Sequence, residues 1–194
     1  MRLDHRKDID QEMVQQVREG NESAFNELVK RWHPRVYNYA LRYSNDRIFA
    51  EEVTQKSFLH LYEKLDQLRD VSKFKGWFYK IVNNECLSEG RKLKRKNNLF
   101  TVTSSFPSVS DMNNPEKIYN RKERGQVVLI ALQQIPEEQR QVIIMKEYEE
   151  LKFWEIAEIT GESENTIKSR MYYGLDAMRK ILMQYKWTKE LYHG

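Results

Sequence analysis

Polar and cationic side chains between positions 163 and 170 have the types and spacing needed to contact DNA. They follow Ala157 and Gly161, and Ile167 lies six residues beyond the glycine, which is the spacing of a helix-turn-helix. Gly161 supplies a positive-φ turn, and Ser163 caps a second helix whose first turn can face base edges in the major groove. The side chains expected to contact DNA are Ser163, Asn165, Thr166, Lys168, Ser169 and Arg170. A plain helical hairpin with solvated charges is the alternative.

A second group of cationic, amide and aromatic side chains lies between positions 73 and 92. Aromatic rings stack on unpaired bases and cations follow phosphates, so this mixture favours nucleic acid. Trp77 falls on an apolar stripe at helical spacing with Phe74, Phe78 and Ile81, so we interpret it as core rather than as a stacking residue. The side chains expected to contact DNA, with Tyr79, Lys80 and both asparagines facing outward, are Lys73, Lys75, Tyr79, Lys80, Asn83, Asn84, Arg91 and Lys92.

The other reactive side chains show no catalytic pattern. There is no carboxylate cluster at metal spacing, no phosphate-binding glycine loop and no nucleophile beside a base, so the sequence does not predict an enzyme. The four histidines and Cys86 lack metal-ligand spacing, and no cofactor is expected. A single cysteine excludes an internal disulfide, suits a reducing compartment, and is interpreted as a buried thiol.

Charge and hydropathy favour a cytoplasmic protein that binds a polyanion. The 194 residues carry a formal net charge of +4, with five cations in the six residues Arg91 to Lys96. A solvated linker is the other interpretation of this run. The chain has no apolar run typical of a signal peptide or a membrane span, so no membrane segment is expected.

The elements that position these groups are predicted to be helices only, in two small domains. Helices are expected at 10–19, from Ser23, from Pro34, from Asp46 to about Leu65, and from Phe74, which together make a domain over residues 10–96. Residues 97–115 are rich in Ser, Thr, Asn and Pro and are predicted to be a flexible linker. Helix resumes at Glu116 in a second domain, 116–185, in which Pro136 begins a helix before the helix-turn-helix.

Two motif sets resemble the bacterial sigma factors of the extracytoplasmic-function (ECF) type, within the sigma-70 family. Ile135-Pro136-Glu137-Glu138-Gln139-Arg140-Gln141-Val142, Glu155-Ile156-Ala157 and Thr166-Ile167-Lys168-Ser169-Arg170 are similar to family elements in the C-terminal domain. Ala50-Glu51-Glu52-Val53-Thr54-Gln55-Lys56-Ser57-Phe58 and the segment from Phe74 to Asn84 are similar to family elements in the N-terminal domain. The resemblance covers roughly residues 10 to 185.

This resemblance implies a function for each domain. Residues 10–96 would be sigma region 2, which binds core RNA polymerase and recognises and melts the −10 element, and residues 116–185 would be region 4, which recognises the −35 element. The implied partners are core RNA polymerase, promoter DNA and a separate cognate anti-sigma factor. The implied polymerase-binding residues are Glu51, Glu52, Gln55, Lys56 and Leu59.

The chain departs from the family pattern at three positions. Lys56 reverses a usual negative charge on the implied polymerase-binding surface, Ser88 stands where an Asp is common, and Gly90 is expected to end or loosen a helix.

Three other functions stay open from the sequence. They are a two-domain helix-turn-helix regulator that does not join polymerase, an enzyme acting on nucleic acid, and an anti-regulator that retains the fold.

Overall fold

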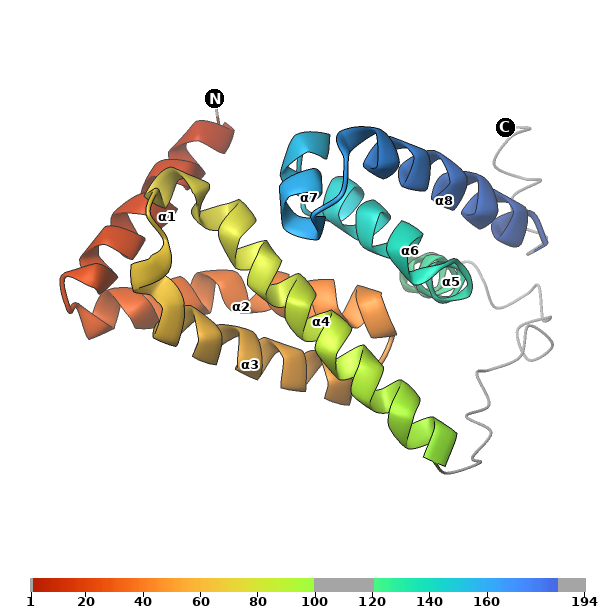
Figure 1. Ribbon diagram of the computed structural model, residues 1–194, viewed down its shortest axis with the longest axis horizontal. Helices are drawn as coiled ribbons and strands as arrows, with labels where there is room; N and C mark the ends of the chain where they lie inside the picture. Colours follow the sequence, from red (N-terminus) through yellow and green to blue (C-terminus); the bar gives the residue numbers. More distant parts are fainter. Residues whose placement is uncertain (1, 100–120, 185–194) are drawn as a thin grey trace.

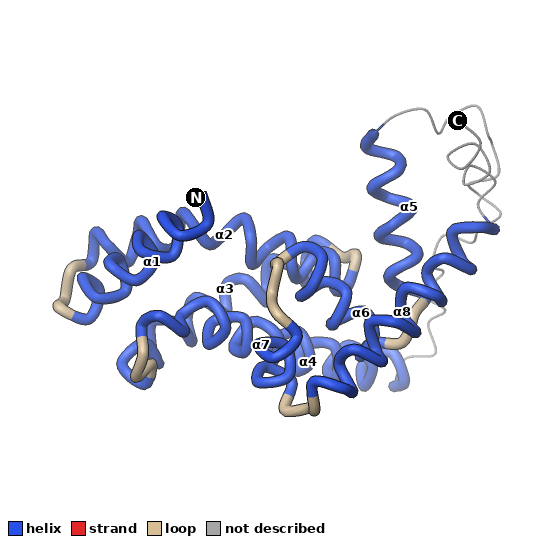
Figure 2. The backbone as a smooth tube through the Cα atoms, turned by 90° about the horizontal axis from the view of Figure 1, so that it is seen from above, coloured by secondary structure: helices blue, strands red, loops and turns tan. Residues whose placement is uncertain are grey.

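Helices build both halves of the chain, and the two halves pack against each other (Figure 1). The computed structural model describes residues 2–99 and 121–184, and all regular secondary structure within these ranges is helical, with no strand. The prediction of an all-α chain with two helical regions is therefore confirmed. Figure 2 shows the same arrangement from above, with α5 extending away from the N-terminal helices.

The N-terminal half contains four long helices. They are α1 (Arg2–Arg18), α2 (Glu22–Ser44), α3 (Arg47–Lys64) and α4 (Phe74–Leu99), with short 3-10 turns η1 (Leu65–Gln67) and η2 (Val71–Lys73) between the last two. The C-terminal half contains α5 (Arg121–Gln134), α6 (Glu137–Ile143), the π-helical turn η5 (Ile144–Tyr148), α7 (Phe153–Thr160) and α8 (Glu164–Gln184). In Figure 1, α4 runs diagonally across α2, with α3 on one side of it and the C-terminal helices on the other.

Several helix boundaries differ from those expected. Asn21, not Ser23, caps α2 by accepting a hydrogen bond from the Ala24 N–H, at 3.1 Å. Pro34 lies inside α2 and does not begin a new helix. Since Trp32 and Val36 on either side of it are both buried in one core, packing offsets the backbone hydrogen bond that proline cannot donate. The predicted helix start at Asp46 is confirmed, and the structure adds that Asp46 caps α3 by accepting a hydrogen bond from the Phe49 N–H at 3.0 Å.

Helix α4 is longer than predicted. It continues through Gly90 to Leu99, so the expectation that Gly90 could end the helix is wrong, and residues 97–99 of the predicted linker are the last residues of α4. One turn after Gly90, Lys94 binds Glu137 of α6 at 2.5 Å and so joins the end of α4 to the other half. The rest of the predicted linker and the predicted helix start at Glu116 lie outside the described residues, where α5 is first described from Arg121.

One continuous hydrophobic cluster joins the two halves. At its centre Trp32 is fully buried, and the rings of Phe74, Phe78 and Tyr79 meet it edge-on at centroid distances of 5.3, 5.6 and 5.7 Å. The cluster continues into buried side chains of the C-terminal half such as Ile144. Cys86 is buried within it, as predicted, and burial raises the pKa of its thiol.

Candidate DNA and polymerase interfaces

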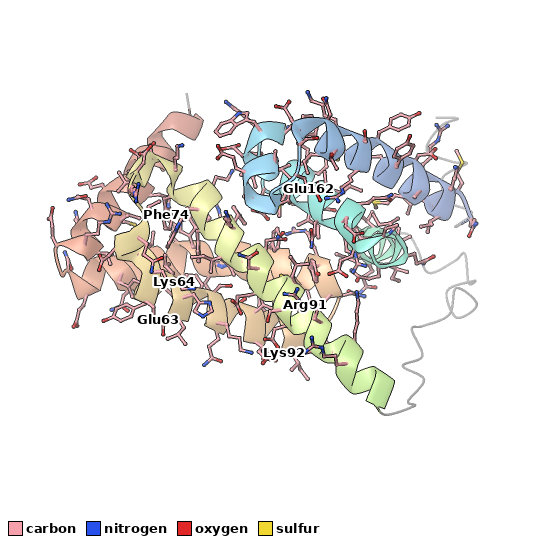
Figure 3. All side chains as sticks on the ribbon, in the orientation of Figure 1. Glu63, Lys64, Phe74, Arg91, Lys92 and Glu162 are labelled. Atoms are coloured by element: carbon pink, nitrogen blue, oxygen red, sulfur yellow. The ribbon has the colours of Figure 1, made fainter. Side chains whose placement is uncertain are left out.

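Helices α7 and α8 form the predicted helix-turn-helix. Gly161 ends α7 at φ +77°, and its N–H donates to the Ala157 carbonyl at 2.9 Å. Ser163 caps α8, because its hydroxyl oxygen accepts the Thr166 N–H at 3.1 Å. Ile167 is fully buried, so it fixes the second helix to the core as expected. The turn between the helices is exposed at Gly161, Glu162 and Ser163, and Figure 3 labels Glu162 within it.

The six predicted DNA-contacting side chains of α8 lie together on its first turns. Ser163, Asn165, Lys168 and Ser169 are exposed, and Thr166 and Arg170 are half-buried. Lys168 pairs with Glu164 at 2.7 Å, and Arg170 pairs with Glu162 at 2.8 Å. Both cations are therefore held close to the start of α8, and their acidic partners are on the surface, where an ion pair contributes little energy and is readily exchanged.

The predicted DNA-contacting residues of α4 fall into two classes. Lys73, Lys80, Asn84, Arg91 and Lys92 are exposed, and Lys75 is half-buried. Tyr79 and Asn83 are buried, so the expectation that their side chains face outward is wrong. Asn83 accepts a hydrogen bond from the Tyr39 hydroxyl at 3.1 Å, deep in the N-terminal half.

The error at Tyr79 has a tertiary cause. The apolar stripe expected on α4 gives it one buried face, but the C-terminal half covers a second face next to the first. Tyr79 lies between the two, and its hydroxyl donates a hydrogen bond to the Glu149 carboxylate. Burial, together with this negative charge, raises the pKa of Tyr79 and keeps its hydroxyl protonated as a donor. Trp77, interpreted as core, is half-buried against the same cluster.

The cations of α4 form two separate clusters. Lys75 and Lys73 of the preceding turn η2 flank Phe74 at the N-terminal end of α4, while Arg91 and Lys92 lie further along the helix; Figure 3 labels Phe74, Arg91 and Lys92. At 1.5 Å per residue, the Cα atoms of positions 74 and 91 are about 25 Å apart along the axis. The two clusters therefore cannot hold the same phosphate, and each would meet a different part of a nucleic acid.

A cavity of about 620 Å³ is lined by the start of α4 and by α7. Its walls combine Trp77 and Lys80 of α4 with the loop at Arg69, and with Lys152 and Trp154 from the C-terminal half. Trp154 is 46% exposed. Aromatic and cationic side chains from both halves thus face one space, an arrangement that the sequence did not reveal because the residues lie some 80 positions apart.

The predicted polymerase-binding residues lie on the outer face of α3. Glu51, Glu52, Gln55 and Leu59 are exposed, with Leu59 at 55%. The structure adds Ile48 and Tyr62, exposed at 76% and 68%, which the sequence analysis missed. The signal for them was available, since Leu59 and Tyr62 are three residues apart on one helix and so share a face. Three large exposed apolar side chains on one helix are typical of a protein-binding surface.

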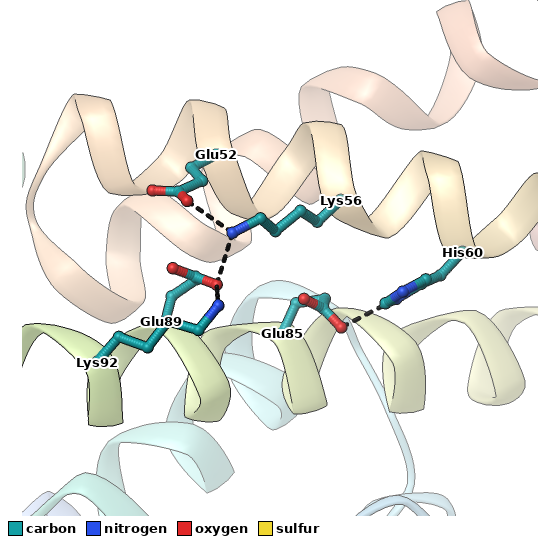
Figure 4. A network of polar contacts seen from close by, with 6 residues as sticks. All are labelled: Glu52, Lys56, His60, Glu85, Glu89 and Lys92. Atoms are coloured by element: carbon teal, nitrogen blue, oxygen red, sulfur yellow. Dashed lines mark hydrogen bonds and ion pairs between the residues drawn. The ribbon is translucent and has the colours of Figure 1, made fainter.

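Lys56 differs from its neighbours on α3, because its charge is engaged within the chain (Figure 4). Its ammonium lies 2.6 Å from Glu52 and 2.7 Å from Glu89 of α4, and Glu89 also binds Lys92 at 2.7 Å. The hydrogen bonds to Glu52 and Glu89 raise the pKa of Lys56. Burial opposes ionisation of Glu89, but the bonds from Lys56 and Lys92 outweigh it and lower the pKa of this carboxyl. Lys56 therefore ties α3 to α4.

A second polar contact joins the two halves at the far end of α2. The Tyr43 hydroxyl binds the Glu137 carboxylate, and Arg140 donates to the Tyr43 carbonyl at 2.6 Å. Burial opposes ionisation of Glu137, but the hydrogen bonds from Lys94 and Tyr43 lower the pKa of its carboxyl. The motif that opens the C-terminal domain, from Ile135 to Val142, thus contacts the N-terminal half through two of its charged side chains.

None of the helices in residues 2–99 and 121–184 combines the length and apolar composition needed to cross a bilayer. Within the same ranges, no three His, Cys, Asp or Glu side chains converge as metal ligands would.

Comparison with known proteins identifies both halves. Residues 28–96 match the family model of Sigma-70 region 2, and residues 126–178 match that of Sigma-70, region 4. The chain is 30% identical over 178 residues to the ECF RNA polymerase sigma-E factor of Escherichia coli, covering 87% of this chain and 92% of that protein. It is 27% identical over 180 residues to the RNA polymerase sigma-H factor of Pseudomonas aeruginosa, covering 89% and 93%.

Solved structures share this fold. The sigma factor RpoE of Bartonella quintana, crystallised with the anti-sigma factor NepR, superposes with a TM-score of 0.66 at 22% identity, over 82% of this chain and 96% of that one. CnrH, solved with the cytosolic domain of CnrY, gives 0.67 at 20% identity, over 91% and 98%. With both region models matched in order and relatives aligned over most of their length, the chain belongs to the ECF group of the sigma-70 family of bacterial RNA polymerase sigma factors.

Proposed function

We propose that this chain acts as an alternative sigma factor, which binds core RNA polymerase and directs initiation at promoters with particular −35 and −10 elements. The observation that carries the proposal is the presence of both matched regions, 28–96 and 126–178, on one chain, with an exposed helix-turn-helix in the second. In this function the chain is a non-catalytic specificity subunit of the cytoplasmic transcription machinery.

The first turns of α8 would recognise the −35 element. Asn165 is exposed near the start of the helix, where an amide can bond adenine through two hydrogen bonds. Lys168 and Arg170 would contact phosphate or guanine, after exchanging Glu164 and Glu162 for DNA. Ser163, Thr166 and Ser169 complete this surface, although the Ser163 hydroxyl also caps the helix.

The N-terminal half would recognise and melt the −10 element through the exposed members of the predicted set. Lys73, Lys75 and Lys80 surround the cavity at the start of α4, where Trp77 supplies an aromatic wall. Asn84, Arg91 and Lys92 would follow the DNA further along the helix. Tyr79 and Asn83 are left out, because both are buried.

The outer face of α3 would bind core RNA polymerase. Leu59 and Tyr62 provide apolar contact, with Gln55, Glu51 and Glu52 around them. Lys56 contributes less than its position implies, because two carboxylates already neutralise it. A separate cognate anti-sigma factor is proposed as a further partner, since the similar RpoE structure is of a sigma factor in complex with the anti-sigma factor NepR.

Run-off transcription with core polymerase and fragments of the parent genome tests the proposal. Promoter-specific transcripts that require the chain are the expected result. DNA binding without any stimulated transcript would instead favour the two-domain regulator that does not join polymerase. The double variant Gln55→Ala, Leu59→Ala is the control for polymerase binding. It should bind the same DNA as the wild-type chain but give fewer transcripts.

A further inference from the structure

One acidic side chain of the C-terminal half is buried against basic side chains of the N-terminal half. Glu149 is only 8% exposed. Its carboxylate accepts a hydrogen bond from Tyr79, and its backbone carbonyl accepts one from the Lys75 ammonium at 2.5 Å. The two halves therefore meet here through Glu149, whose carboxylate and backbone carbonyl bind Tyr79 and Lys75 of α4.

An unusual backbone presents Glu149. It follows the π-helical turn η5, and the next residue, Glu150, has φ +55° although it is not a glycine. π-helical turns are rare and are frequent at functional sites, and a left-handed non-glycine residue is kept only where the surroundings require it. The turn is closed by the Leu151 N–H, which donates to the Met145 carbonyl at 3.0 Å. The result is a carboxylate that reaches the Tyr79 hydroxyl of α4.

The cations around Glu149 come from two helices. Arg35 and Arg42 lie seven residues apart on one face of α2, and Lys75 lies at the start of α4. All three attract the Glu149 carboxylate electrostatically. Among the described residues, no carboxylate oxygen lies within 4 Å of a guanidinium nitrogen of Arg35 or Arg42. Their contacts are with rings: the Arg42 guanidinium lies 4.1 Å from the Tyr148 ring centroid, and that of Arg35 lies 5.0 Å from the centroid of Trp32.

A cavity of about 290 Å³ opens beside these groups. Its lining residues are Pro34, Arg35, Asn38, Arg42, Lys75, Tyr148, Glu149 and Glu150. Arg35 and Arg42 are half-buried and Asn38 is exposed, so solvent and small anions reach the cations through its mouth. Two guanidinium groups, an ammonium and an amide converging on one space have the donors that a phosphate needs.

We propose that Arg35, Arg42 and Lys75 form a phosphate-binding site for the DNA backbone, in which the Glu149 carboxylate acts as a competing intramolecular anion. The proposal rests on the proposed function, which makes promoter DNA the ligand. It adds Arg35 and Arg42 of α2 to the DNA-contacting residues proposed on α4. It also implies that DNA binds this site poorly while the two halves are packed together, because Glu149 then lies beside the cations.

The relative strengths of the two anions support exchange. Burial raises the pKa of Glu149, and the nearby hydroxyl and cations only partly offset this effect, so its charge is held weakly. A DNA phosphodiester keeps its negative charge at all pH values at which the protein is folded, and it presents several acceptor oxygens to guanidinium groups. Movement of the C-terminal half would withdraw Glu149 and leave the cations to the phosphate.

Binding of a short fluorescent single-stranded oligonucleotide to the full chain, followed by fluorescence anisotropy, tests the site. Arg42→Gln is expected to weaken binding about three- to tenfold and to reduce the slope of log K against log salt by about 0.7, the value for one phosphate on a single strand. Glu149→Gln should have the opposite effect and tighten binding about threefold, because it removes the competing charge. Glu149→Ala repeats this test if the Gln variant does not fold.

Matched charge changes elsewhere provide the controls. Arg47→Gln on α3 and Glu27→Gln on α2 alter the net charge equally at exposed positions, and each should change affinity less than twofold. Weaker DNA binding by both Arg42→Gln and Glu149→Gln would mean that the contact is only structural and would overturn the proposal, as would changes no larger than those of the controls. Failure of the wild-type chain to stimulate run-off transcription would reject the sigma function separately, whatever these variants do.

Discussion

The Lys56 ammonium of α3 lies 2.7 Å from the Glu89 carboxylate of α4, and Glu89 is almost fully buried. This pair explains how the chain accommodates a positive charge on the surface of α3 that we propose binds polymerase. The lysine faces inward toward α4 as much as outward, so the exposed surface of α3 keeps the acidic Glu51 and Glu52 with apolar Leu59 beside them. The pair leads to a stability prediction.

Lys56→Glu should destabilise the N-terminal half by about 2 kcal/mol or more, because it places a third carboxylate beside Glu52 and the buried Glu89. Urea unfolding followed by circular dichroism measures the change. Lys30→Glu is the control, since the Lys30–Glu27 pair is exposed and should contribute less than about 1 kcal/mol. The exchange of both charges in Lys56→Glu, Glu89→Lys should recover part of the loss. No recovery would mean that the two side chains are not coupled.

Leu59→Ala together with Gln55→Ala should raise the Kd for core polymerase about tenfold, as removal of exposed apolar anchors does at protein interfaces. Folding stability should stay within about 0.5 kcal/mol of wild type, because both side chains are on the surface. Competition binding against a labelled sigma factor measures the affinity. Lys30→Ala on α2 is the control surface change, and an unaltered Kd for the double variant would exclude this face of α3.

Arg170→Ala should weaken binding of −35 DNA by about 1 kcal/mol or more, because it removes a cation at the start of the recognition helix. Electrophoretic mobility shift with promoter fragments obtained from run-off transcription measures the effect. Lys180→Ala, at the other end of α8 and paired with Asp176 at 2.7 Å, is the matched cation. Equal losses for the two variants would indicate a general charge effect and no base recognition.

Gly174→Ala should destabilise the C-terminal half by about 1 to 3 kcal/mol, because α6 and α8 meet closely at this position. An added Cβ would lie 2.9 Å from Ile143 Cδ1 and 3.1 Å from Gln139 Cβ. Gly125→Ala in α5 is the control, since no atom lies within 4 Å of its added Cβ and helix propensity alone should stabilise by about 1 kcal/mol. The Tm of Gly174→Ala should therefore fall and that of Gly125→Ala should rise. A shift of both Tm values in the same direction would contradict the close packing at Gly174.

Glu149 should make the stability of the chain depend on pH in an unusual direction. Burial raises its pKa above the ordinary value of 4.5 despite Tyr79, Arg42, Lys75 and Arg35 around it, so the folded state binds this proton more tightly than the unfolded state does. Its contribution to stability is therefore complete below about pH 4.5 and is lost as the pH rises through the raised pKa.

Glu149→Gln keeps the side-chain shape without the charge, so the variant should gain stability relative to wild type as the pH rises from about 4.5 toward neutral. Urea unfolding of both proteins across this range gives the difference directly and cancels the other carboxyl groups. A difference that shrinks toward neutral pH would show that the ionised carboxylate is net stabilising in the folded state.

The local elements of this protein were predictable because each depends on residues close together in the chain. Asp46 and Ser163 cap helices, Gly161 turns the chain, and Ile167 is buried on its helix as its spacing requires. Two motif sets in order were enough to indicate the family, and with it the two-region organisation. The exposed face of α8 was likewise predicted correctly, since the polarity of a single helix determines it.

The sequence by itself therefore determined the helices, the turn chemistry and the family. Only the tertiary structure decided which sides of α4 are buried, because a second helical layer covers a face that looks polar in sequence. Tyr79 and Asn83 are inside for this reason, and Pro34 is tolerated within α2 because the core holds both parts of the helix. The cluster of Arg35, Arg42 and Lys75 around Glu149 joins residues up to 114 positions apart, and no local pattern encodes such a distance.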